Sequence, residues 1–160
     1  MRIFFLFVLT GILLGACGDT KNSAGKKQSL DQLLVAHPDS VELLVQKGNM
    51  LMDSLAFDRA LTFGAKAFRL DSNNTEARTL YAECLINKSN RSADDIFRAF
   101  TMYRNLVKKS PKNVAALVGL ANTLVLLNDH DNAFKYINQA LRIDKTYRDA
   151  YILKGTIYKL

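Results

Sequence analysis

The chain has 160 residues, of which 22 are Lys or Arg and 15 are Asp or Glu, so its formal net charge is +7. The basic residues are scattered, with their densest cluster at 108–112, and they do not form the continuous patch that nucleic-acid binding requires. The two histidines, His37 and His130, lie in predicted turns with no nucleophile or ligand set beside them. The sequence therefore predicts no catalytic centre, no metal site and no cofactor.

Residues 1–16 are predicted to form a secretory signal peptide. Arg2 supplies a positive charge, and residues 3–16 form an apolar run with a single Thr and two Gly. This run is shorter than the roughly 18 apolar residues at which a membrane-spanning helix is suspected. We therefore expect the segment to be removed from the protein rather than retained as a membrane span.

The apolar run ends in Leu14, Gly15, Ala16 and Cys17, a pattern that resembles the lipobox of bacterial lipoproteins. The resemblance implies cleavage before Cys17, a diacylglycerol on its thiol and a third acyl chain on its amine, and two or three chains anchor a protein stably. Glycine rather than aspartate follows Cys17, so the resemblance favours the periplasmic leaflet of the outer membrane. The alternative is an ordinary secreted protein whose signal peptide contains a cysteine.

Two short segments are predicted to connect this anchor to the folded part. Residues 17–28 comprise the lipidated cysteine and a polar stretch without periodicity, which predicts a flexible tether with a mean span of about 18 Å. Residues 29–40 are predicted to form a capping helix, because Ser29 and Gln32 have the spacing of a capping box. Asp39 and Glu42 have the same spacing at the start of the next helix.

Small residues recur along the rest of the chain. Gly48, Ala82, Ala121 and Gly155 follow one another at a step of about 34 residues, except that the step from Ala82 to Ala121 is longer by five. Ala60, Ala99 and Ala133 recur in the same way, and the step from Ala60 to Ala99 is again the longer one. An insertion of five residues between Ala82 and Ala99 explains both longer steps, and we place it in residues 87–95 as a lengthened turn. Because the recurring residues have little bulk, we expect the two helices of each repeat to approach closely there.

A period of about 34 residues in helical sequence resembles the tetratricopeptide repeat, TPR. The matching residues include Gly48, Leu51, Ala60 and Ala67, then Tyr81, Ala82, Ala99 and Pro111, then Leu120, Ala121, Ala133 and Ala140. Repeat 1 covers residues 41–74, repeat 2 with the insertion 75–113, and repeat 3 114–147, while 148–160 form the first helix of a fourth repeat or a solvating helix. The resemblance implies an all-α, right-handed solenoid of antiparallel helix pairs.

In TPR proteins the first helices of the repeats line a concave groove that holds a peptide or a helix of a partner. The resemblance places the following residues in this groove: Val45, Asn49, Met52, Glu76, Thr79, Glu83, Val118, Asn122 and Val125. Asn49 and Asn122 occupy equivalent places, where an amide can both donate to and accept from a peptide backbone. The alternative, which the sequence leaves equally open, is that Asn49 and Asn122 are solvent-exposed helix residues without a binding role.

The pattern departs from TPR domains that clamp a terminal carboxylate, because Val45, Ala115 and Gly119 stand where the clamp residues would be. Cys84 lies in a helical pattern and is predicted to be a buried, inert thiol. We therefore predict a lipid-anchored, non-enzymatic scaffold that binds a protein or peptide of the cell envelope, with no small-molecule substrate evident. The alternative is the N-terminal tether of a longer lipoprotein whose downstream domain is an enzyme or a nutrient-binding module.

Overall fold

A computed structural model describes residues 28–159 of the chain. The predicted signal peptide, Cys17 and nearly all of the predicted tether lie outside these residues. The described part contains eight α-helices and no β-strand. Within it, no helix combines the length and the apolar character that crossing a bilayer requires.

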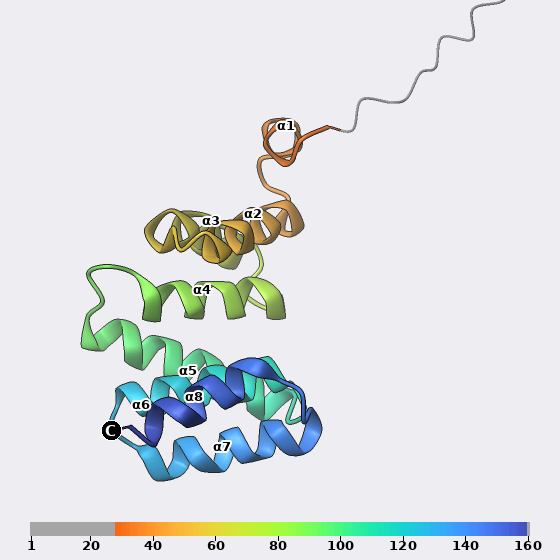
Figure 1. The fold of residues 1–160 in the computed structure, drawn as a ribbon. Helices are drawn as coiled ribbons and strands as arrows, with labels where there is room; N and C mark the ends of the chain where they lie inside the picture. Colours follow the sequence, from red (N-terminus) through yellow and green to blue (C-terminus); the bar gives the residue numbers. More distant parts are fainter. Residues whose placement is uncertain (1–27, 160) are drawn as a thin grey trace, which may run out of the picture.

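The helices follow one another as antiparallel pairs (Figure 1). Their bounds are Leu30–Ala36 for α1, Val41–Asp53 for α2, Phe57–Leu70 for α3, Thr75–Asn87 for α4, Ala93–Lys109 for α5, Val114–Leu126 for α6, His130–Ile143 for α7 and Arg148–Ile157 for α8. From α1 to α8 each helix packs against the next, and the first helices α2, α4, α6 and α8 also contact one another in succession. The predicted all-α solenoid of helix pairs is therefore confirmed.

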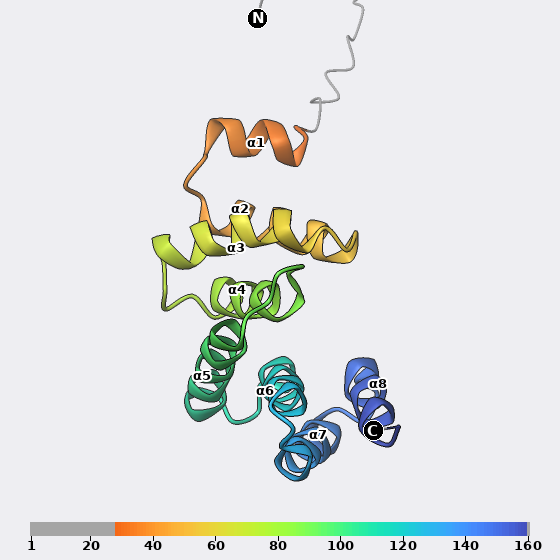
Figure 2. The ribbon, with the colours of Figure 1, turned by 90° about the vertical axis from the view of Figure 1, so that its left-hand side faces the viewer.

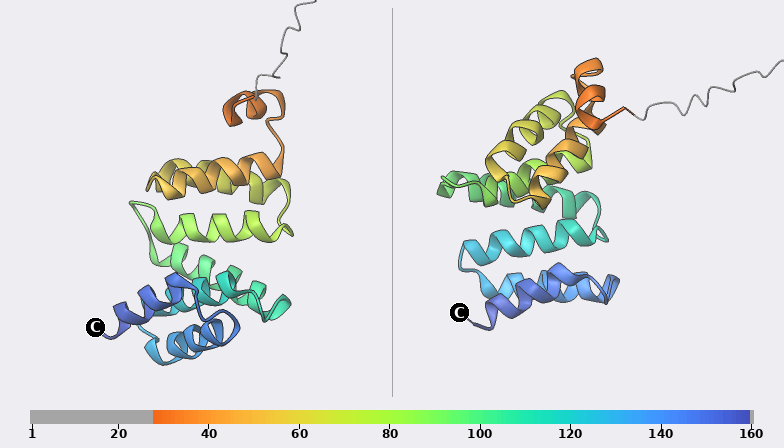
Figure 3. Two further views of the ribbon diagram at one scale, coloured as in Figure 1. Left: turned by 45° about the vertical axis from the view of Figure 1, so that its right-hand side comes forward. Right: turned by 45° about the horizontal axis from the view of Figure 1, so that its top comes forward.

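The helix axes turn along the stack. Helices α2 and α3 run across both perpendicular views, whereas α5 to α8 run across Figure 1 and are seen nearly end-on in Figure 2. The oblique views of Figure 3 show the same change of direction between the helix pairs. This rotation is what brings α8 back towards α4, across the face formed by α6.

The helix starts follow the period of the repeat. Ser40, Asn74 and Asn113 occupy equivalent places before α2, α4 and α6, and the side chain of each accepts a hydrogen bond from a backbone N–H in the first helical turn. Because Ser40 caps α2, the predicted capping box of Asp39 with Glu42 is wrong. Asp39 instead forms an ion pair with Lys66 of α3 at 2.9 Å.

Helix α1 begins with the predicted capping box of Ser29 and Gln32, which is confirmed. It meets α2 as α7 meets α8. Lys47 of α2 donates to Asp31 at 2.6 Å, and at the matching repeat positions Lys154 of α8 donates to Asn138 at 3.1 Å. Helix α1 therefore stands where the second helix of a preceding repeat would stand, although it buries none of its residues fully.

The five inserted residues are divided between a turn and a helix. The turns inside repeats 1 and 3 have three residues, 54–56 and 127–129, whereas the turn inside repeat 2 has five, 88–92. The other three extend the start of α5, which has 17 residues where α3 and α7 have 14. The expectation of a lengthened turn alone is thus corrected, because Ser92 and Asp95 form a capping box that starts α5 early.

The interior forms two apolar clusters. The N-terminal cluster joins α2, α3 and α4, and the C-terminal cluster joins α4 to α8. Ala60, Ala99 and Ala133 are 0% exposed, as the close helix approaches require. Gly155 differs, since a Cβ added there would meet nothing within 4 Å, whereas one added at Gly48 would meet Leu80 of α4, the next first helix.

Candidate binding groove

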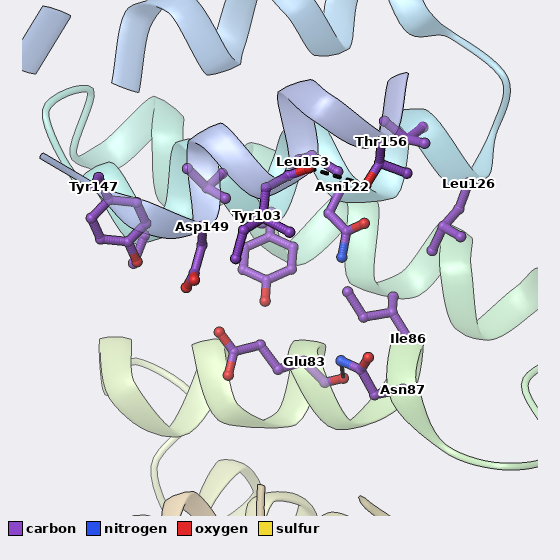
Figure 4. Close-up of a pocket in the computed structure, with 15 residues that line it drawn as sticks. Glu83, Ile86, Asn87, Tyr103, Asn122, Leu126, Tyr147, Asp149, Leu153 and Thr156 are labelled. Atoms are coloured by element: carbon purple, nitrogen blue, oxygen red, sulfur yellow. Dashed lines mark hydrogen bonds between the residues drawn. The ribbon is translucent and has the colours of Figure 1, made fainter. Parts of the chain in front are cut away.

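Two hollows lie along the face formed by the first helices. The N-terminal hollow, of about 310 Å³, is lined by Asn49, Thr75, Glu76, Thr79, Leu80, Glu83, Asn113 and Ala115. The C-terminal pocket, of about 420 Å³, lies between α4, α6 and α8 (Figure 4). Its lining includes Glu83, Ile86, Tyr103, Ala115, Val118, Asn122, Val125, Tyr147, Asp149, Leu153 and Thr156. Glu83 and Ala115 line both hollows, so the two lie next to each other along this face.

Seven of the nine predicted groove residues line these hollows. Asn49, Glu76 and Thr79 line the N-terminal hollow, Glu83 lines both, and Val118, Asn122 and Val125 line the C-terminal pocket.

The other two predicted groove residues, Val45 and Met52, belong to the packing between α2 and α4. Val45 is 5% exposed and is a member of the N-terminal cluster. Met52 packs against the same cluster, and the Cys84 thiol lies 3.6 Å from its sulfur. Neither residue offers the groove much surface.

Tyr103 is a lining residue that the sequence analysis did not predict. It comes from α5, a second helix, whereas the resemblance assigns the groove to first helices alone. Its ring is 0% exposed, and a Cβ added to Gly119 of α6 would lie 2.3 Å from that ring. Gly119 therefore makes the room that Tyr103 occupies. A glycine inside an otherwise apolar helix is the sequence signal that could have pointed to this contact.

The Tyr103 hydroxyl has no hydrogen-bond partner among the described residues. Figure 4 shows it pointing towards α4, into the space above Glu83. Burial raises the pKa of Tyr103 well above its ordinary value, and the charge of Glu83 acts in the same direction, so the hydroxyl keeps its proton. The hydroxyl therefore has a donor and acceptor capacity that no group of the described chain uses.

Glu83 and Asp149 make the C-terminal pocket acidic. Glu83 is half-buried, and its burial together with the Asp149 carboxylate raises the pKa of Glu83 to about 7. Neither carboxylate has an ion-pair partner in residues 28–159. No Lys, Arg or His lines either hollow. The groove is thus acidic although the chain as a whole carries a net charge of +7.

Cys84 follows Glu83 in α4, and its thiol is inaccessible. Its side chain is 0% exposed, and burial, followed by the charge of Glu83, raises the pKa of the thiol to about 12. The predicted burial of Cys84 is confirmed, and a thiol that keeps its proton at neutral pH is a poor nucleophile. Across the described residues, no three His, Cys, Asp or Glu side chains gather in a way that could hold a metal ion.

Comparison with known proteins places the chain among TPR folds. No protein-family model matches it. A curated relative, a DnaJ homolog subfamily C member 7 homolog of Schizosaccharomyces pombe, is 27% identical over 126 residues, which are 72% of this chain and 26% of the relative. The chain thus spans about a quarter of the length of that relative.

Two solved structures are similar over most of the chain. MamA is 21% identical with a TM-score of 0.62, over 81% of this chain and 73% of MamA. YrrB, described as a TPR protein with an unusual peptide-binding site, is 21% identical with a TM-score of 0.63, over 79% of this chain and 62% of YrrB. At these identities the likeness establishes the fold, which is that of a TPR solenoid.

Proposed function

We propose that this chain is a non-catalytic binding protein whose groove along α2, α4, α6 and α8 holds a segment of a partner protein. The observation that carries the proposal is that the two hollows are neighbours on one face and share Glu83 and Ala115. Together they expose polar groups of several successive first helices to one extended ligand. Asn49 and Asn122 make no side-chain hydrogen bond to residues 28–159, so both amides are available to a peptide backbone.

The binding mode that this surface supports is recognition of an extended or helical segment. The groove combines amides and carboxylates with apolar groups such as Val118 and Val125. Peptides that lie in grooves gain affinity from main-chain hydrogen bonds and specificity from pockets for individual side chains. The C-terminal pocket, at about 420 Å³, is large enough to receive such a side chain.

Position-specific photo-crosslinking tests the groove. A photoreactive phenylalanine analogue is introduced at Thr79 or Asn122 in the groove, and at Thr62 or Asn138, exposed on the second helices, as matched controls. After irradiation of intact cells we expect partner adducts from the two groove positions and none from the controls. Adducts from the second-helix positions alone would assign binding to the opposite face and reject the groove.

The proposal includes a lipid anchor at Cys17 and a place in the cell envelope, on the outer membrane. The support is the sequence pattern Leu14-Gly15-Ala16-Cys17 after a short apolar run. We expect Cys17→Ser to abolish fatty-acid labelling, because serine cannot form the thioether. Metabolic labelling with a radioactive fatty acid, followed by membrane fractionation, measures this. Label retained by the variant would reject the lipoprotein assignment without affecting the groove.

A further inference from the structure

We propose that the C-terminal pocket receives the cationic end of a Lys or Arg side chain carried by the partner segment. This inference rests on the proposed function, because a segment lying in the groove is what brings the side chain to the pocket. Three features of the pocket lead to it: two carboxylates without a cation, a buried hydroxyl without a partner, and apolar walls between the pocket mouth and its floor.

The two carboxylates approach the pocket from different helices. Glu83 projects from α4, and Asp149 projects towards it from α8 (Figure 4). The two carboxylates repel each other, and a cation placed between them relieves the repulsion. Three other carboxylates of the described chain, those of Asp31, Asp39 and Asp95, already have lysine partners within 4.0 Å. Glu83 and Asp149 have no such partner in residues 28–159, and both line one pocket.

The Tyr103 hydroxyl lies on the floor of the same pocket. It is fully buried, has no partner in residues 28–159 and points towards Glu83. A hydroxyl oxygen offers two acceptor lone pairs, and an ammonium or guanidinium group has only donors to give. An entering cation therefore satisfies the hydroxyl and both carboxylates, whereas an anion satisfies neither carboxylate.

Apolar side chains form the walls between mouth and floor. Ile86, Val118 and Leu153 line the pocket from α4, α6 and α8. Lysine and arginine bury their methylene stems along such surfaces while the charged end reaches polar groups. A wholly apolar side chain would fill the walls and leave Glu83 and Tyr103 buried without partners, which is costly. The chemistry therefore selects a long side chain with a positive end.

Binding of a cation is coupled to the proton on Glu83. The titratable groups that face Glu83 are Asp149 of α8, Tyr147 at the start of α8, and Tyr103 of α5, with Glu76 and Cys84 on its own helix. The groups that α2 and α6 present to the groove near Glu83 are the uncharged Asn49 and Asn122. Because the pKa of Glu83 is about 7 without a ligand, the carboxylate is charged at pH 8 and largely protonated at pH 6. Cation affinity should rise across this interval.

The test uses small probes in place of the unidentified partner. Pentylammonium, N-acetyl-lysine-N-methylamide and the uncharged 1-pentanol are titrated into the ¹⁵N-labelled full chain at pH 8 and followed by amide shifts. We expect both amines to bind in roughly the millimolar range, at least about tenfold more tightly than 1-pentanol. The shifts should centre on Asn122 and Thr156, which line the pocket.

Charge-neutral variants locate the effect. Glu83→Gln and Asp149→Asn keep the side-chain shape, and each should weaken pentylammonium binding at least about fivefold. Glu83→Gln should also remove the gain in affinity between pH 6 and pH 8. Asp131→Asn is the matched control, because Asp131 is the second residue of α7 as Asp149 is of α8, and it lies outside the pocket. It should bind pentylammonium like the parent chain.

The outcomes separate this inference from the proposed function. Equal affinity for 1-pentanol and pentylammonium, or equal losses in Asp131→Asn and Asp149→Asn, overturns the cation pocket. If pentylammonium binds and the lysine derivative does not, the pocket binds a free amine and the proposed partner side chain is rejected. If neither amine binds while photo-adducts still form at Thr79 and Asn122, the groove function stands and the cation pocket falls. If the amines bind but no photo-adducts form at Thr79 and Asn122, the proposed function is rejected, and the cation does not come from a partner segment.

Discussion

The interface between repeats 1 and 2 and the interface between repeats 2 and 3 use the same two repeat positions in opposite ways. In the first, Gly64 of α3 faces Leu80 of α4, whose Cγ would lie 3.2 Å from a Cβ added to the glycine. In the second, at the equivalent positions one repeat later, Tyr103 of α5 faces Gly119 of α6. The large side chain comes from the first helix in one interface and from the second helix in the other.

The larger of the two hollows lies at the interface in which the pair is reversed. Leu80 lies in the N-terminal cluster, where α2 and α4 pack directly. Tyr103 instead carries a hydroxyl to the groove floor, where α4 and α6 make few contacts and the pocket remains open. A repeat protein can thus acquire a pocket by reversing one small–large pair, without altering its helix order.

Substitutions at Tyr103 and Gly119 should produce the largest effect on stability. Gly119→Leu drives a side chain into the Tyr103 ring and should lower the free energy of unfolding by about 1–3 kcal/mol. Tyr103→Gly leaves a cavity and should lower it by about 3–5 kcal/mol. The double variant recreates the glycine–leucine arrangement of the first interface. Its decrease in the free energy of unfolding should therefore be smaller than the sum of the two single decreases by at least about 0.5 kcal/mol. Urea unfolding measures all three, and strict additivity would refute the pairing.

Glu83 should make the free energy of unfolding depend on pH. Because the folded chain raises its pKa from 4.5 to about 7, the folded state holds this proton more tightly than the unfolded state does. The stabilisation is fully present below pH 4.5 and is lost as the pH rises through 7. We therefore expect Glu83→Gln to raise the free energy of unfolding at pH 8 by about 1–2 kcal/mol, and to change it little at pH 4.

The control for this effect is Glu42→Gln, because Glu42 is an exposed residue of the first turn of α2. Its free energy of unfolding should follow that of the parent chain at both pH values. Equal gains at pH 8 from both substitutions would mean that general charge reduction, and not the site of Glu83, is responsible.

Removing the Tyr103 hydroxyl should have a smaller effect on the free energy of unfolding, and it should stabilise the protein. Tyr103→Phe deletes a buried polar group and should raise the free energy of unfolding by about 1 kcal/mol. Tyr81→Phe is the natural comparison, since the Tyr81 hydroxyl accepts a hydrogen bond from Arg98 at 3.3 Å. That substitution should be neutral or slightly destabilising. Thermal unfolding of the two variants checks this, and destabilisation by Tyr103→Phe would imply a partner for its hydroxyl.

The smallest expected effect concerns the turns inside repeats 1 and 3. Leu55 and Asn128 occupy matching positions, and both have left-handed backbones, with φ of 60° and 59°. Asparagine tolerates this conformation better than leucine does, and Leu55 is 73% exposed, so little packing is lost on its replacement. Leu55→Asn should stabilise by about 0.5 kcal/mol, and Asn128→Leu should destabilise by a similar amount. Equal urea midpoints for the two variants would contradict this.

The fold could be predicted because its signals are local and periodic. The capping box of Ser29 and Gln32 marks the start of α1, and buried alanines such as Ala60 and Ala133 recur with the repeat. The division of the insertion escaped prediction. Ser92 and Asp95 are polar, and polar residues suit a helix cap as well as they suit a loop.

The candidate site could be predicted only in part, because part of it depends on how helices cross. Asn49 and Asn122 follow from the repeat register alone. Tyr103 enters the groove because Gly119 admits it from a second helix, a pairing visible only once α5 and α6 are packed. Asp149 reaches Glu83 because the turning of the stack carries α8 towards α4, although the two residues lie far apart in the sequence.

Among residues 28–159, helix α1 is the only helix with no fully buried residue. Its contacts with α2 include the ion pair of Lys47 with the exposed Asp31 and the partly buried Leu34, whereas every later helix contributes fully buried side chains. A pulling force applied on the N-terminal side of α1 would detach and unravel it before the remaining helices. Each helical residue that extends adds about 2 Å of reach, because the rise grows from about 1.5 Å to about 3.4 Å. Unravelling of α1 would therefore lengthen the chain on the N-terminal side of α2 while the groove keeps its shape.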